Sequence, residues 1–153
     1  MKKILITGAS GQLGASLQLN NYNIIRTDII LQDDQEHFKV LDITNEEQVN
    51  ALLEKEKPDV IIHLAAMTNV DGCERNPNQA QLINVLGTEN LLNHFMGKFI
   101  FVSSDYVFDG EDGPYTEDDD VNPINVYGKT KLEGEASVRK LSNDWGILRT
   151  NVV

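Results

Sequence analysis

The chain has 153 residues, one cysteine, 41% hydrophobic residues and a formal net charge of −11. The length suits one domain with a substantial core, Cys73 alone excludes an intrachain disulfide, and the negative charge argues against binding nucleic acid by phosphate neutralisation. Since no apolar run approaches the ~20 residues that cross a bilayer, we expect a cytoplasmic protein with no membrane partner.

Short apolar runs alternate with longer amphipathic stretches, which is typical of α/β proteins. In chain order, the pattern predicts strand 3–6, helix 13–19, strands 23–27 and 38–40, helix 45–55, strand 59–64, helix 76–91, strand 99–103, helix 126–141 and strand 146–149. Thr44 is the expected cap of the second helix, with Glu47 completing a capping box. Near-continuous apolar strands separated by helices predict a Rossmann-type doubly wound parallel sheet of about six strands, covered on both faces.

The first strand leads into a glycine-rich turn over residues 7–14, Thr-Gly-Ala-Ser-Gly-Gln-Leu-Gly. The glycines permit a tight turn and the close approach of a pyrophosphate, toward which the next helix directs its positive N-terminal end. Asp28 follows Gly8 by about 20 residues, where a carboxylate accepts hydrogen bonds from the adenosine ribose. The pattern predicts a nicotinamide dinucleotide site; a flavodoxin-like turn with another ligand, or with none, is the alternative.

The choice between NAD(H) and NADP(H) depends on Asp28 and Arg26. A carboxylate at Asp28 repels a 2′-phosphate, so NAD(H) is the default. Arg26 lies two residues earlier on the same strand face and can offset this repulsion, which leaves NADP(H) open.

Tyr127 and Lys131 are four residues apart, so they share one face of a helix. An ammonium near the phenol lowers the pKa of the tyrosine, and the pair can then relay a proton to or from a carbinol oxygen. Lys131 can also reach the nicotinamide ribose. The alternative is an ordinary surface helix face.

The fifth strand ends in Ser103 and Ser104, at the carboxyl edge where open α/β sheets bind ligands. A hydroxyl there can stabilise charge that develops on a substrate oxygen. Because neighbouring strand residues face opposite ways, only one serine should serve, and periodicity does not choose between them.

No metal site is expected, because His37 and His94 lack the cysteine or carboxylate spacing of zinc ligands, and His63 is expected to pack in the core or beside the cofactor. The acidic stretch 105–120 lacks the ordered oxygen ligands of a calcium site. It is expected to be a solvated loop.

Together these features resemble the extended short-chain dehydrogenase/reductase family, and more closely its dTDP-4-dehydrorhamnose reductase group. The resemblance rests on residues 8–14, 63–71, 103–110 and 122–131. The Asp-Tyr-Val-Phe-Asp-Gly string at 105–110 is much more specific than the glycine turn.

The resemblance implies a role for individual residues. Ser104 becomes the catalytic serine, Tyr127 the proton donor and Lys131 its partner. The residues expected to bind the cofactor are Gly8, Ser10, Gly11, Gln12, Leu13, Asp28, Asp42, Ile43, Ala65, Ala66, Tyr127 and Lys131. The residues expected on the substrate side are Thr68, Val70, Asp105 and Tyr106.

The implied reaction is hydride transfer from NAD(P)H to C4 of a nucleotide-activated 4-keto-6-deoxy sugar, with Tyr127 protonating the oxyanion. Members of the family continue past the sixth strand into a smaller lobe that holds the nucleotide-sugar. We therefore expect residues 1–153 to form the NAD(P)-binding domain, with that lobe absent, the fragment inactive alone and an apolar patch exposed at its edge. A homodimer is a candidate assembly.

Two other functions stay open. One is an epimerase or dehydratase of the same superfamily, although Tyr106 stands where a dehydratase is expected to carry a Glu beside Asp105. The other is a non-catalytic regulatory subunit resembling the methionine adenosyltransferase β subunit, which shares the Asp-Tyr-Val-Phe-Asp-Gly and Tyr-Gly-Lys-Thr-Lys strings.

Overall fold

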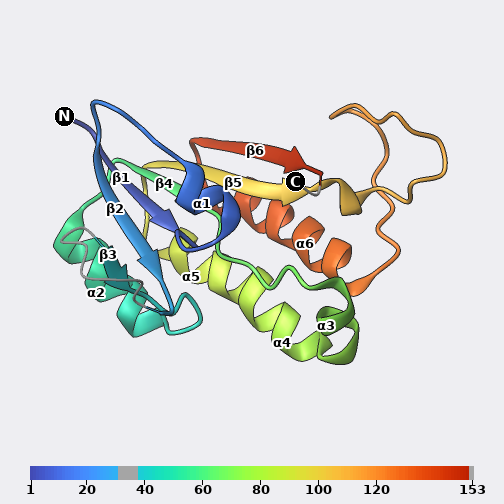
Figure 1. Ribbon diagram of the computed structural model, residues 1–153, viewed down its shortest axis with the longest axis horizontal. Coiled ribbons are helices and arrows are strands. Elements are labelled where there is room, and N and C mark those ends of the chain that lie inside the picture. Colours follow the sequence, from blue (N-terminus) through green and yellow to red (C-terminus); the bar gives the residue numbers. More distant parts are fainter. Residues whose placement is uncertain (31–37, 152–153) are drawn as a thin grey trace.

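A computed structural model describes residues 1–30 and 38–151. In this part of the chain, six parallel strands form one sheet in the order β3-β2-β1-β4-β5-β6 (Figure 1). The strands are β1 Lys3–Thr7, β2 Asn23–Asp28, β3 Phe38–Val40, β4 Val60–His63, β5 Lys98–Ser104 and β6 Trp145–Thr150. The strand order reverses between β1 and β4, and ligands bind at the carboxyl ends beside such a point. The predicted Rossmann-type sheet is confirmed.

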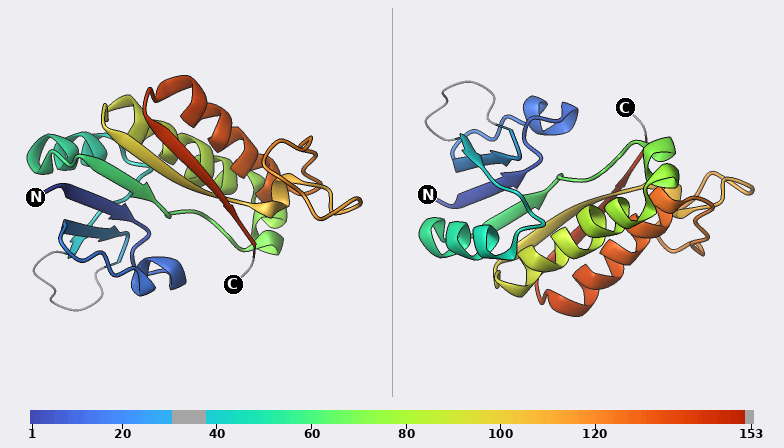
Figure 2. Two further views of the ribbon diagram at one scale, coloured as in Figure 1. Left: turned by 90° about the horizontal axis from the view of Figure 1, so that it is seen from above. Right: turned by 90° about the horizontal axis from the view of Figure 1, so that it is seen from below.

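Three of the helices, α2, α5 and α6, cover one face of the sheet, and α1 lies on the other (Figure 2). The helices are α1 Gln12–Ser16, α2 Glu46–Glu56, α3 Val70–Arg75, α4 Pro77–Gln81, the π-helix η1 Leu82–Leu86, α5 Gly87–Asn93, the 3-10 helix η2 Asp105–Val107 and α6 Val126–Leu141. Helix α6 has the predicted bounds. The predicted helix 76–91 forms as α4, η1 and α5 in succession.

Alternating strand residues supply two cores, because successive side chains of a strand point to opposite faces. Leu5 of β1 packs in the larger core beneath α2, α5 and α6, whereas Ile4 and Ile6 pack beneath α1. The second face is covered less completely than the first. At the edge strand, Trp145 and Leu148 are 40% and 56% exposed, so β6 presents apolar side chains to solvent.

Helix α1 is shorter than the predicted helix 13–19. Leu17 leaves the helical backbone conformation at φ −68° and ψ 117°. The guanidinium of Arg26 donates to the carbonyl oxygens of Gly14 and Leu17, each at 2.6 Å. Arg26 thus satisfies carbonyl groups that a longer helix would have bonded internally.

Asn45, rather than Thr44, caps α2. The Asn45 side chain accepts a hydrogen bond from the backbone N–H of Gln48 at 3.1 Å. The Thr44 hydroxyl instead donates to Asp42 Oδ1 at 2.7 Å. The predicted capping box is wrong because a preceding carboxylate takes the hydroxyl.

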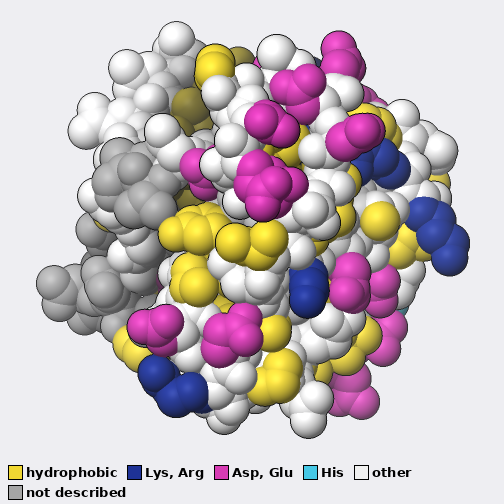
Figure 3. All heavy atoms as spheres, turned by 90° about the vertical axis from the view of Figure 1, so that its right-hand side faces the viewer, with side chains coloured by type: hydrophobic (Ala, Val, Ile, Leu, Met, Phe, Trp, Pro, Cys, Tyr) yellow, Lys and Arg dark blue, Asp and Glu magenta, His cyan; other side chains and the backbone are white. Residues whose placement is uncertain are grey.

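The predicted solvated loop over 105–120 is confirmed only from Gly110 onward, since Asp105–Val107 form the 3-10 helix η2 and Val107 and Phe108 are buried. Asp109 organises its base by accepting hydrogen bonds from Tyr115 Oη at 2.7 Å and Asn122 Nδ2 at 3.0 Å. The bond from Tyr115 is the largest cause that lowers the pKa of Asp109 to about 2. Figure 3, which looks onto the side where this loop lies, shows acidic side chains gathered at the surface.

A buried ion pair joins α6 to β6. Glu135 is fully buried and accepts hydrogen bonds from Arg149 Nε at 2.9 Å and Nη2 at 2.8 Å. A second cation, Arg139, lies 3.2 Å from Glu135 but has a side chain that is 45% exposed. Burial is the largest single effect and acts to raise the pKa of Glu135, but the hydrogen bonding to Arg149 and the nearby arginine charges together outweigh it, so this pKa lies below its ordinary value.

The two arginines provide a matched test of this pair. We predict that Arg149→Gln lowers the free energy of unfolding by about 3–5 kcal/mol, because it leaves a buried carboxylate without its main partner. Arg139→Gln should cost about 0–1 kcal/mol, because solvent screens an exposed pair. Urea denaturation measures both, and equal losses would contradict the assignment of the stabilising interaction to Arg149.

Candidate functional site

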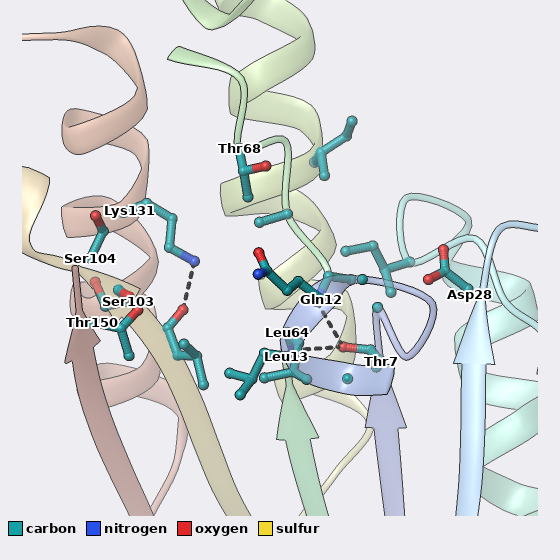
Figure 4. A pocket seen from close by; sticks show the side chains of 18 of the residues that line it. Thr7, Gln12, Leu13, Asp28, Leu64, Thr68, Ser103, Ser104, Lys131 and Thr150 are labelled. Carbon is teal, nitrogen blue, oxygen red and sulfur yellow. Dashed lines mark hydrogen bonds between the residues drawn. The ribbon is translucent and has the colours of Figure 1, made fainter. Parts of the chain in front are cut away.

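A cavity of about 930 Å³ follows the carboxyl edge of the sheet. It extends from Asp28 on β2, past Gln12 and Leu13 of the glycine turn, to Ser104 and Lys131 on the other side (Figure 4). Its volume lies within the range of small-molecule and cofactor sites. The cavity therefore joins the two groups of residues that the sequence singled out.

The glycine turn packs directly against the backbone that follows β4. Gly8 has φ +67°, and a Cβ atom there would lie 2.6 Å from the nitrogen and 2.7 Å from the Cα of Ala65. The N–H of Gly11 donates to the carbonyl of Gly8 at 3.1 Å and closes the turn. Helix α1 has five residues, so its dipole contributes less at this turn than the sequence led us to expect.

Thr7 links the same two segments by side-chain hydrogen bonds. Its hydroxyl oxygen accepts from the N–H groups of Leu64 at 3.2 Å and Ala65 at 3.3 Å (Figure 4). Its hydroxyl group donates a hydrogen bond to Nδ1 of His63, with 2.6 Å between Oγ1 and Nδ1. Thr7 therefore holds the end of β4 against the end of β1.

His63 continues this chain of hydrogen bonds to the helical layer. Thr88 uses its hydroxyl proton to bond the carbonyl oxygen of Asn84 at 2.8 Å, so it accepts a hydrogen bond from His63 Nε2 at 2.9 Å. His63 is then neutral, with its proton on Nε2 and with Nδ1 accepting from Thr7. Burial lowers the pKa of His63 to about 3, and the Lys131 charge acts in the same direction.

Asn84 is a site residue whose role the sequence did not establish. It is 1% exposed and lies within the π-helix η1. Its side chain accepts from the N–H of Met67 at 2.7 Å and donates to the carbonyl of Met67 at 3.1 Å and to Thr130 Oγ1 at 3.0 Å. Asn84 thus fixes the loop after β4 to α6.

The end of the cavity where the adenosine is expected contains Asp28, Asp42 and Ile43. Asp28 accepts hydrogen bonds from the N–H of Ser10 at 3.0 Å and of Ile29 at 2.8 Å, so it also holds the glycine turn. The Arg26 guanidinium, which could offset the repulsion of a 2′-phosphate, bonds the carbonyls at the end of α1 in this structure.

The opposite end contains Ser104, Tyr127 and Lys131. Ser104 Oγ accepts from the N–H of Tyr106 at 3.1 Å and donates to Asp105 Oδ1 at 3.3 Å. Lys131 is 4% exposed and donates to the carbonyl of Val102 at 2.8 Å. These contacts place a hydroxyl, a phenol and an ammonium along one wall of the cavity.

The pKa of Tyr127 shifts in the direction opposite to the expected one. Burial is the largest cause and raises this pKa, while a hydrogen bond with Ser104 acts to lower it. The ammonium of Lys131 is directed at the carbonyl of Val102. Burial lowers the pKa of Lys131 to about 8, against the opposing effect of Glu135.

Most of the predicted site residues line the cavity. Those that do are Gly8, Gly11, Gln12, Leu13, Asp28, Asp42, Ile43, Ala65, Ala66, Thr68, Val70, Ser104, Tyr106, Tyr127 and Lys131. Ser10 and Asp105 do not line it; they bond Asp28 and Ser104 respectively. Ser103 lines the cavity together with Ser104, so strand alternation does not separate the two serines.

Several lining residues were not predicted. They include Thr7, Thr27, Ile29, Leu41, Thr44, Leu64, Gln79, Ile83, Val102, Thr150 and Asn151. Helix α3, which begins at Val70, was also missed. Its signal in the sequence is Asn69, whose side chain accepts from the N–H of Gly72 at 2.7 Å as an N-cap.

Within residues 1–30 and 38–151, no group of three His, Cys, Asp or Glu side chains could hold a metal ion. His94 lies 3.0 Å from Glu46, and His37 lies outside the described residues. None of the helices in this part of the chain is long and apolar enough to cross a membrane.

The contact between Gly8 and Ala65 can be tested by adding a methyl group. We predict that Gly110→Ala costs roughly 1–2 kcal/mol of unfolding free energy, since Gly110 also has positive φ but has nothing within 4 Å of an added Cβ. Gly8→Ala should cost at least about 1–3 kcal/mol more, because it adds an overpacking collision to the same backbone strain. Urea denaturation of both variants measures the difference, and equal costs would show that the close approach is unimportant.

The neutral state of His63 predicts a pH dependence of stability. Because its folded pKa is about 3 and its unfolded pKa about 6.5, its contribution is fully present above about pH 6.5 and is lost as the pH falls toward 3. His63→Gln keeps an acceptor and a donor but does not titrate, so its unfolding free energy should fall less steeply between pH 7 and 4. Parallel pH profiles for the two proteins would refute the assignment.

Comparison with known proteins identifies a matching family and several relatives of the chain. A family model described as the RmlD substrate binding domain matches residues 1–153. Methionine adenosyltransferase 2 subunit beta of Xenopus tropicalis is 40% identical over 99% of this chain and 47% of that protein. The dTDP-4-dehydrorhamnose reductase of Aggregatibacter actinomycetemcomitans is 41% identical over 99% of this chain and 51% of that protein.

Among solved structures, the dTDP-4-dehydrorhamnose reductase of Bacillus anthracis in complex with NADP superposes with a TM-score of 0.89 and 39% identity. The match covers 99% of this chain and 54% of that chain. The chain thus spans about half the length of the curated relatives it matches.

Proposed function

The chain belongs to the RmlD substrate-binding-domain family, within the extended short-chain dehydrogenases/reductases, and we propose that it is the cofactor-binding unit of an NAD(P)H-dependent reductase. The proposed substrate is a nucleotide-activated 4-keto-6-deoxy sugar of the dTDP-4-dehydrorhamnose type. The observation that carries the proposal is one continuous cavity that joins the glycine turn and Asp28 to Ser104, Tyr127 and Lys131.

The residues present fit a dinucleotide. Gly8 and Gly11 line the cavity and carry no side chain, so the backbone of the turn can approach a pyrophosphate closely. Asp28 and Asp42 would face the adenosine, Ala65 and the adjacent Ala66 the middle of the cofactor. Lys131 would hold the nicotinamide ribose.

A bound NAD(P)H supplies the hydride that reduces C4 of the sugar. Tyr127 donates the proton to the carbonyl oxygen, and its raised pKa keeps the phenol protonated at neutral pH. The Ser104 hydroxyl hydrogen-bonds the same oxygen and stabilises the charge that develops there. Lys131 remains mostly cationic at neutral pH because its pKa is about 8. Its positive charge therefore stabilises negative charge that develops near it.

The substrate class is supported by the relatives and by the cavity wall. Two of the relatives described above are named dTDP-4-dehydrorhamnose reductases. Thr68, Val70 and Tyr106 line the cavity beside the proposed catalytic residues. We place the sugar against this wall.

Substitution of Tyr127 tests the chemistry. Tyr127→Phe should lower kcat by about 10²–10⁴-fold, the usual contribution of a general acid, while the Kd for reduced cofactor changes little. Tyr115→Phe is the control, because it removes a phenol that bonds Asp109 in the exposed loop. The assay uses the protein together with its substrate lobe and follows NADH or NADPH oxidation that depends on a dTDP-4-keto sugar; equal rates for the two variants would sink the proposed role of Tyr127.

A regulatory subunit is the second candidate function. It is favoured by the 40% identity to methionine adenosyltransferase 2 subunit beta. The two candidate functions differ in whether the protein reduces the sugar. Sugar-dependent cofactor oxidation supports the reductase, whereas stable association with a methionine adenosyltransferase catalytic subunit and no turnover supports the regulatory function.

A further inference from the structure

The proposed proton donor, Tyr127, lies in the part of its helix that the helix itself secures least. Tyr127 is the second residue of α6. The N–H groups of the first turn of a helix have no intrahelical partner, and helix ends fray. The position of the phenol therefore depends on contacts that come from outside α6.

Two short helices, η2 and α3, pack against this first turn (Figure 1). A Cβ atom at Gly128 would collide with the carbonyl oxygen of Tyr106 in η2. The ring of Tyr106 lies edge-on to that of Tyr127, with 5.6 Å between the centroids. From α3, the fully buried Cys73 packs in one cluster with Tyr127. Because apolar packing is non-directional, it does not by itself fix the end of α6 relative to α3.

Glu74 of α3 supplies the directional contact. Its Oε1 accepts a hydrogen bond from the N–H of Val126 at 2.6 Å, and the Asn125 side chain accepts from the N–H of Gly128 at 2.7 Å. Among the described residues, the bond from Val126 to Glu74 is the one hydrogen bond between α3 and α6. A carboxylate is a strong acceptor and also interacts favourably with the positive end of a helix.

Helix α3 also belongs to the wall against which we place the sugar. Val70, its first residue, lines the cavity together with Thr68. Glu74 does not line the cavity, and its side chain is exposed. The bond to Val126 thus joins the wall that would contact the sugar to the helix that would protonate it.

We propose that Glu74 is a positioning residue, which joins the first turn of α6 to α3 and so holds the phenol of Tyr127 in place relative to the sugar. This inference rests on the proposed function, because it presumes that Tyr127 donates a proton to a bound substrate. A displacement of about 1 Å at a reacting group can lower the rate by about 10²-fold. A single hydrogen bond outside the cavity can therefore change kcat.

Gln81 provides a matched control on the same helix. Its Nε2 donates to Glu133 Oε2 at 2.6 Å, which is a second exposed side-chain bond between a short helix and α6. Gln81 ends α4 and does not line the cavity. Glu133 lies beyond the first turn of α6, so loss of this bond leaves the segment around Tyr127 in place.

Steady-state kinetics of the protein together with its substrate lobe tests the inference. Glu74→Ala should lower kcat by roughly 10–100-fold, while the KM for a dTDP-4-keto sugar and the Kd for reduced cofactor change little. Glu74→Gln keeps an oxygen acceptor for the Val126 N–H, so it should restore most of the lost rate. Gln81→Ala should keep kcat near the wild-type value.

Amide hydrogen exchange supplies a readout that needs neither cofactor nor sugar. In Glu74→Ala, the N–H groups of Val126 and Tyr127 should exchange faster than in the wild-type protein, because local opening of the first turn becomes easier. In Gln81→Ala, these two groups should exchange at the wild-type rate.

The possible failures are distinguishable. A wild-type kcat in Glu74→Ala, equal losses in Glu74→Ala and Gln81→Ala, or no recovery in Glu74→Gln would each overturn the inference. The proposed function would survive these results as long as Tyr127→Phe is impaired. Absence of sugar-dependent cofactor oxidation in the wild-type protein would overturn the proposed function and this inference together.

Discussion

The ends of β1 and β4 meet backbone to backbone, and the arrangement of the site depends on that contact. Gly8 approaches Ala65 so closely that no Cβ fits between them, while the Thr7 hydroxyl accepts hydrogen bonds from the two N–H groups that follow β4. His63 extends the contact to Thr88 on α5. A break at any point of this chain would leave buried polar groups without partners, which is costly in a low-dielectric interior.

Burial at the end of the cavity with Tyr127 and Lys131 has two effects that would work together in the proposed reductase. It raises the pKa of Tyr127 and lowers that of Lys131 to about 8. A phenol that stays protonated is suited to donate a proton to an oxyanion, whereas abstraction of a proton from an alcohol requires the phenolate. Glu135, one helical turn beyond Lys131 and held by Arg149, favours the ammonium and keeps the lysine cationic near neutral pH.

The sequence predicted the features that follow from periodicity and missed those set by side-chain competition. Short apolar runs were sufficient to predict the six strands, and the amphipathic pattern was sufficient to predict α6. Both patterns reflect burial, on a sheet face or along one stripe of a helix. They could not choose Asn45 over Thr44 as a cap, since that depends on Asp42 capturing the hydroxyl. The Tyr127–Lys131 spacing correctly brought both side chains to one cavity, but the sign of the pKa shift depended on burial, which spacing does not reveal.

Asp28 holds the glycine turn in place as well as lining the cavity. Its carboxylate holds the N–H groups of Ser10 and Ile29, so its replacement by an apolar residue would loosen the glycine turn. Ile29 shares the cavity wall but donates only its backbone N–H to this arrangement. Its side chain is thus free to change charge while the turn keeps its shape.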